Sequence, residues 1–158
     1  AHQEIAKLGL LYPPGPLSLE QVTDSVLNVA RFGVFDLPAV MLAGERARAV
    51  RVMESLRAEG EPLPLLLWTI TEELRMVARL RALLDRGENP NQAARTVWVR
   101  REREQVTLQA ARRVESERAS ALLARCAEVD RLFKGLRAER ADADPWLELT
   151  DIVLAVAS

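Results

Sequence analysis

The 158 residues, 49% hydrophobic and 28% charged, are enough for one globular core that needs neither disulfides nor metal. The formal net charge of -1 excludes a global field that attracts DNA or membranes, so such binding would have to be local. Cys126 is the only cysteine, which excludes an intrachain disulfide and favours a reducing cytoplasmic location.

The first 31 residues are predicted to form two helices. Ile5 and Leu8 share a face of the first helix, which ends in the proline-rich stretch 11–16 because proline removes a backbone donor. Ser18 and Gln21 have the spacing of a capping box, which predicts that the second helix starts there.

Helical periodicity lapses around residues 31–36. We therefore predict a domain boundary here, between a segment of residues 1–31 and a helical domain of residues 32–158. The chain begins at Ala1 without an initiator methionine or a signal sequence and enters a helical pattern at once, so we expect it to be part of a longer protein.

Three helices are predicted between residues 36 and 85. Asp36 is a candidate N-cap for a short helix with Pro38 in its first turn and Gly44 at its end. A second helix runs to Gly60 and exposes its arginines. The third and longest spans 62–85, and the residues predicted for its buried face are Leu67, Ile70, Leu74, Val77 and Leu84.

Four further helices are predicted after residue 88. Asn89 and Pro90 are typical of an N-cap and first helical residue, and this helix is expected to run through Trp98. Asp144 and Pro145 begin the last helix in the same way. Between them, two apolar stripes define the other helices: Val106, Ala110 and Val114, then Leu122, Cys126, Val129 and Phe133. With no alternating strand pattern, the fold class is all-α, an irregular helical bundle.

The sequence contains few of the residues that catalytic and metal sites require. His2 is the only histidine, so zinc sites and Ser-His-Asp or Cys-His units lack their ligands and bases. The glycines are isolated, which excludes phosphate-binding glycine loops. Exposed glutamates such as the pairs 72–73 and 102–104 are commonplace on helices. We predict no catalytic residue, cofactor or metal, and interpret Cys126 as a small buried hydrophobe.

A local basic cluster surrounds one aromatic residue, and its members are Arg95, Trp98, Arg100, Arg101 and Arg103. Single-stranded nucleic acid is bound this way, with bases stacked on the ring and phosphates near the guanidinium groups. In the alternative interpretation, Trp98 packs into the core while Glu102 and Glu104 pair with the arginines along a solvated face. Both interpretations are compatible with the sequence.

Several stretches together resemble the delta subunit of the bacterial DNA polymerase III clamp loader, in its C-terminal part. Each motif is degenerate, and the likeness lies in their order and spacing over nearly the whole chain. The stretches are residues 3–8 (QEIAKL), 32–37 (FGVFDL), 56–62 (LRAEGEP) with 65–68 (LLLW), 97–101 (VWVRR), 130–135 (DRLFKG) and 144–149 (DPWLEL).

The resemblance implies that residues 1–31 end a lid domain and that residues 32–158 form a helical collar domain. Collar domains of this family associate with those of the gamma/tau and delta-prime subunits, and the delta subunit hydrolyses no ATP. The family's N-terminal AAA+-like module, absent from this sequence, is the part that binds the sliding clamp. The resemblance also brings the collar near primer-template DNA, which favours a DNA contact at Trp98.

A second class of function is a free-standing helical adaptor or regulator that binds a single protein partner. No membrane association is predicted, because the longest apolar run, Leu65 to Trp68, is far shorter than the ~20 residues that cross a bilayer.

Overall fold

The computed structural model describes residues 33–136 and 143–158. The two helices predicted within residues 1–31 and the predicted domain boundary lie outside the described residues. The described ranges contain no strand, and their helices in chain order are α3 (Leu37–Ala43), α4 (Arg46–Ala58), α5 (Leu63–Asp85), α6 (Pro90–Thr96), the 3₁₀ helix η1 (Arg101–Arg103), α7 (Glu104–Arg113), α8 (Ser116–Phe133) and α9 (Pro145–Val156). The all-α class is confirmed.

Helix α5 is the central element of the bundle and packs against α8, α7, α6, α9 and α3. Its apolar side chains recur every three or four residues, so they form one continuous face. Leu66, Ile70, Leu74 and Val77 on that face are completely buried. Leu84 in the last turn is only half-buried, although the periodicity places it on the same side.

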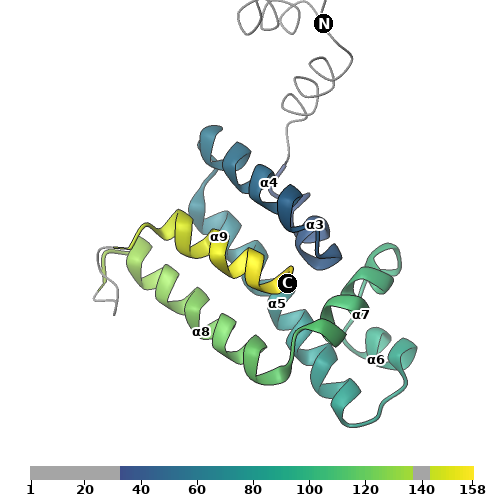
Figure 1. The fold of residues 1–158 in the computed structure, drawn as a ribbon. Coiled ribbons are helices and arrows are strands. Elements are labelled where there is room, and N and C mark those ends of the chain that lie inside the picture. The colour runs from purple at the N-terminus through teal and green to yellow at the C-terminus, as the bar shows by residue number, and fades with distance from the viewer. Residues whose placement is uncertain (1–32, 137–142) are drawn as a thin grey trace, which may run out of the picture. The chain divides into compact units, whose positions relative to one another are not determined.

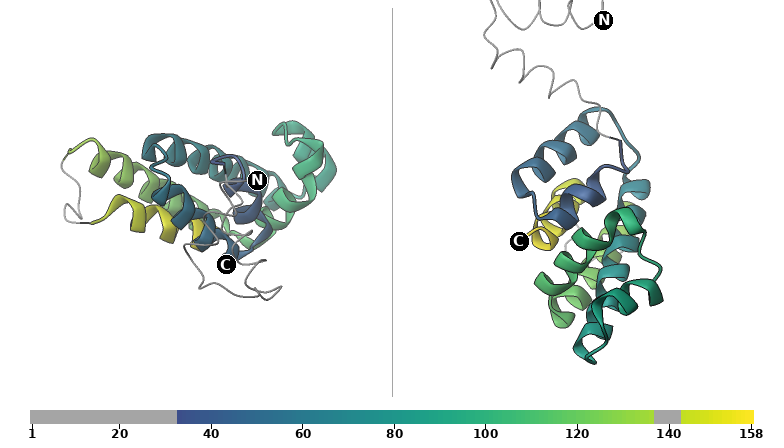
Figure 2. Two further views of the ribbon diagram at one scale, coloured as in Figure 1. Left: turned by 90° about the horizontal axis from the view of Figure 1, so that it is seen from above. Right: turned by 90° about the vertical axis from the view of Figure 1, so that its right-hand side faces the viewer.

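Helix α9 completes the core from the other end of the chain. It runs between α4 and α8 and also contacts α3 and α5 (Figure 1). Leu149, Ile152, Val153 and Val156 have no exposed surface. Helices α6 and α7 lie at the end of the bundle away from the C-terminal end of α8 (Figure 2). None of the described helices is both long and apolar enough to span a bilayer.

The predicted helix starts are confirmed at two asparagine or aspartate caps. The Asn89 side-chain oxygen accepts the backbone N–H groups of Asn91, at 3.0 Å, and Gln92, at 3.4 Å, and Asp144 Oδ1 accepts the N–H of Trp146 at 2.8 Å. Asp36 does precede α3, but its carboxylate makes no cap hydrogen bond within α3. It accepts the Gly33 N–H at 2.8 Å instead, and so closes the turn before the helix.

Phe133, which lies on the apolar stripe predicted for α8, is 47% exposed. A helical period aligns Phe133 with the buried Cys126 and Val129, but it carries no information about where the covering helices end. Phe133 is the last residue of α8. Leu136 and Leu147, which flank the connection from α8 to α9, are also exposed.

Five of the described helices end in the same hydrogen-bonded motif, the Schellman motif, in which one residue adopts a left-handed backbone. In α3 that residue is Gly44, whose φ is 79°. The Gly44 N–H donates to the Met41 carbonyl, and the N–H of the next residue, Glu45, donates to the Val40 carbonyl. Helices α4, α5 and α8 end in the same way at Gly60, Gly87 and Gly135. Helix α6 ends at Thr96, two residues before the predicted end, and the left-handed residue of its motif is Trp98, which lacks the conformational freedom of glycine.

Gly44 carries a second constraint that its counterparts lack, and this predicts different costs of substitution. A Cβ added at Gly44 would lie 3.3 Å from both the Ala157 carbonyl oxygen and Arg113 Nη1, whereas one at Gly87 would meet nothing within 4 Å. We expect Gly87→Ala to destabilise the fold by about 1 kcal/mol, from backbone strain alone, and Gly44→Ala by about 2 to 3 kcal/mol. Urea denaturation of both variants measures the difference, and equal values would exclude a steric contribution at Gly44.

Candidate nucleic-acid interface

Trp98 ends α6 at the position where the other Schellman motifs have glycine. Its N–H donates to the Arg95 carbonyl at 3.1 Å, and the Val99 N–H donates to Ala94 at 2.9 Å. This motif requires a left-handed residue, and the φ of Trp98 is 60°. Within the described ranges it is the only non-glycine residue with a positive φ. A side chain in this conformation costs roughly 1–2 kcal/mol.

Burial of the Trp98 side chain does not offset that cost. Trp98 is 87% exposed, the highest value among the large hydrophobic residues described. The interpretation in which Trp98 packs into the core is therefore wrong. Strained backbone that persists without a packing reason is characteristic of binding and catalytic positions. An exposed, strained tryptophan fits a ring held out to contact a ligand.

Three of the predicted arginines, Arg95, Arg100 and Arg101, are exposed, and Arg100 lines the same hollow as the ring. Arg95 belongs to α6, and Arg100 and Arg101 lie at the start of η1. None of the three forms an ion pair with any residue that the structure describes, so the expected pairing with Glu102 and Glu104 is absent there. Their guanidinium groups are available to an anionic ligand, and an arginine contacts phosphate oxygens through paired N–H donors.

Arg103 differs from these three because it is already paired. Its Nη1 donates to Glu73 Oε1 at 2.8 Å, and its Nη2 lies 2.8 Å from Glu73 Oε2 without the alignment of a hydrogen bond. The Glu73 side chain is only 12% exposed, and the two residues are 30 positions apart in the sequence. Arg103 therefore fixes η1 to the central helix α5, and this contact positions the neighbouring Trp98 turn.

In the part of the chain that the structure describes, Trp98 lines two surface hollows. The first, of about 540 Å³, we call the aromatic groove: Phe35, Trp68 and Trp98 line it with Arg100 and the Arg103–Glu73 pair. The second, of about 470 Å³, we call the basic hollow, and its lining residues are Arg79, Ala82, Leu83, Arg86, Thr96, Val97 and Trp98. Phe35, Trp68, Arg79 and Arg86 could not be assigned to this site from the sequence, because α5 and the turn before α3 bring them in from distant positions.

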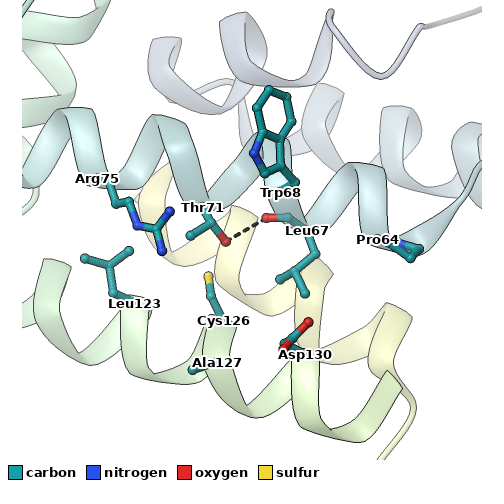
Figure 3. A pocket seen from close by; sticks show the side chains of 9 residues that line it. All are labelled: Pro64, Leu67, Trp68, Thr71, Arg75, Leu123, Cys126, Ala127 and Asp130. Carbon is teal, nitrogen blue, oxygen red and sulfur yellow. Dashed lines mark hydrogen bonds between the residues drawn. The ribbon is translucent and has the colours of Figure 1, made fainter. Parts of the chain in front are cut away.

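A third pocket, of about 370 Å³, lies between α5 and α8 and contains Cys126 (Figure 3). The Cys126 side chain points toward Thr71, whose hydroxyl donates to the Leu67 carbonyl at 2.6 Å. Burial raises the pKa of the Cys126 thiol, so little of it is the reactive thiolate near neutral pH. The interpretation of Cys126 as a small buried hydrophobe is confirmed. No group of metal-binding side chains occurs among the described residues.

Comparison with known proteins matches residues 32–149 to a family described as "DNA polymerase III delta subunit, C-terminal domain". A curated relative, DNA polymerase III subunit delta of Escherichia coli strain K12, is 34% identical over 79 residues. That alignment covers 50% of this chain and 23% of the relative. The aligned half of this chain therefore spans less than a quarter of the relative's length.

Proposed function

Since this chain belongs to the family of C-terminal domains of DNA polymerase III delta subunits, we propose that it is a subunit-assembly domain of a bacterial clamp loader. Residues 32–158 act as the collar domain and residues 1–31 end a lid domain. The partners are the gamma/tau and delta-prime subunits, and the sliding clamp is bound only through the N-terminal module that precedes this segment in the family. In this proposal the chain contributes no catalytic group to the holoenzyme and works inside the cytoplasm.

The family match over residues 32–149 carries this proposal, and the surface of the bundle supports it. A collar domain needs apolar surface that its own core does not cover. Phe35 is 75% exposed, Trp68 58% and Leu147 59%. Exposed apolar side chains that gather in patches are typical of protein interfaces. Phe133 and Leu136 add to the exposed apolar surface where α8 ends.

Assembly can be tested directly by size-exclusion chromatography. This chain, mixed with the collar domains of the gamma and delta-prime subunits, should elute with them as one complex. Replacing Leu147 or Phe133 with aspartate should weaken that complex if the apolar end of α8 and α9 is the contact, whereas Arg51→Asp on α4 serves as an exposed control. Separate peaks for the unmodified chains would contradict the assembly proposal.

We further propose that the Trp98 turn contacts primer-template DNA as it passes the collar. The ring supplies a stacking surface for an unpaired base, and Arg95, Arg100 and Arg101 supply positive charge that no described carboxylate neutralises. Arg103 contributes by holding η1 in place, since its guanidinium is engaged with Glu73. Stacking on a tryptophan contributes about 1–3 kcal/mol per base and tolerates any sequence, as a clamp loader requires.

A further inference from the structure

The basic hollow beside Trp98 is distinguished by its charge. Among the described residues, Arg79 and Arg86 are the only ionisable ones that line it, and none of these residues brings a carboxylate into it. Both side chains are exposed. Arg79 Nε donates to the Arg75 carbonyl at 3.3 Å, and neither arginine forms an ion pair with any part of the chain that the structure describes. Two unneutralised guanidinium groups therefore face one hollow.

The aromatic groove on the same tryptophan has a different character. Its carboxylates, Glu72 and Glu73, are paired with Arg75 and Arg103. An anion entering this groove would approach these carboxylates closely, whereas the described lining of the basic hollow consists of two arginines, Thr96 and apolar side chains. Of the two surfaces that Trp98 lines, the basic hollow is the better match for a phosphate backbone.

We infer that Arg79 and Arg86 bind backbone phosphates of the single strand whose base stacks on Trp98. The inference rests on the DNA contact proposed above and adds its path, from the Trp98 ring across the C-terminal half of α5. The two arginines are seven residues apart, which places them two helical turns from one another on one face. The apolar Ala82 and Leu83, which also line the hollow, suit contact with a sugar or a base edge.

A purely structural role for these arginines makes a different prediction. Cations near the C-terminal end of a helix stabilise its dipole, and Arg86 is the C-cap residue of α5. In that role Arg86→Gln would lower the unfolding temperature and leave DNA binding unchanged. A phosphate contact instead changes how strongly binding depends on salt, because each neutralised phosphate releases counterions.

The test is fluorescence anisotropy of the 158-residue chain with fluorescein-labelled oligo(dT), titrated across a range of sodium chloride concentrations. Removing one arginine that neutralises a phosphate of a single strand reduces the slope of log K against log salt by about 0.7. We expect Arg79→Gln and Arg86→Gln each to reduce the slope by about that amount, and the double variant by about 1.4. Arg51→Gln, an exposed arginine on α4 outside both hollows, should keep the original slope.

The outcomes separate this inference from the proposed function. If Trp98→Gly weakens binding but the arginine variants keep the unmodified slope, the path across α5 is wrong and the Trp98 contact stands. If an arginine variant loses only thermal stability, the structural role explains it and the inference is overturned. If Trp98→Gly also binds normally, or the unmodified chain fails to bind oligo(dT) at the lowest salt, both proposals fail.

Discussion

Replacing Trp98 with glycine is expected to weaken binding of the assembled clamp loader to primer-template DNA by roughly 5- to 150-fold, the loss of one base stack. The same substitution should stabilise the isolated chain by about 1 kcal/mol, because glycine adopts the left-handed backbone without the cost that tryptophan incurs. If Trp98 stabilised the fold by packing, Trp98→Gly would lower the stability instead of raising it. Anisotropy measures the first effect and urea denaturation the second.

Two further variants at this position separate the ring from the backbone. Trp98→Phe keeps an aromatic surface and the strained conformation, so we expect it to retain most of the affinity with no gain in stability. Trp98→Ala should lose affinity for DNA as Trp98→Gly does, but without the gain in stability. DNA binding by Trp98→Gly that equals that of the unmodified protein at every salt concentration would exclude the stacking role.

Replacing Arg113 with methionine is expected to destabilise the fold by about 3 kcal/mol, the loss of charge-assisted hydrogen bonds inside the bundle. Arg113 Nη2 donates to the carbonyls of Leu42, at 3.1 Å, and Val156, at 3.2 Å, and Nε donates to Val156 at 3.3 Å. These carbonyls end α3 and α9, where helix dipoles place partial negative charge. Methionine fills similar space but leaves the carbonyls without a donor.

The environment of Arg113 explains why its loss is expected to destabilise the fold. Burial lowers the pKa of its guanidinium, and the nearby Arg118 lowers it further, yet no carboxylate in the described ranges forms an ion pair with it. Two helix ends serve as its counter-charge. Arg112→Met is the matched control, since the Arg112 side chain is exposed on the same helix and should change stability by less than about 0.5 kcal/mol. Equal unfolding midpoints for the two variants would contradict this role of Arg113.

Most helices could be predicted from the sequence because their ends are marked by capping residues and glycines that act within a few residues. Asn89 and Asp144 cap the helices that they were expected to cap, and Gly44 and Gly60 follow the helices that they were expected to end. Each signal involves hydrogen bonds within a few residues, so neighbouring positions in the sequence are sufficient to predict it. The all-α class follows from the same local patterns.

The candidate site was harder to predict because it is assembled from distant segments. The Arg103–Glu73 pair joins residues 30 positions apart, and the expected partners of the arginines were the nearer Glu102 and Glu104. The left-handed backbone of Trp98 could not be predicted from the sequence either. A left-handed residue after a helix is normally glycine, and no glycine is present at this position. The exposure of the Trp98 side chain depends on how α5, α6 and η1 pack against one another. Helical periodicity does not determine this packing.

The placement of α9 has a consequence for how the protein is made. Its four fully buried side chains fill space between helices formed by residues that the ribosome synthesises much earlier, from α3 onward. Until Val156 has left the exit tunnel, α9 cannot cover the apolar side chains of the helices that it contacts in the folded structure. Completion of the core described above must therefore wait for α9, and an mRNA that stops before the codon for Pro145 would yield a polypeptide for proteases to remove.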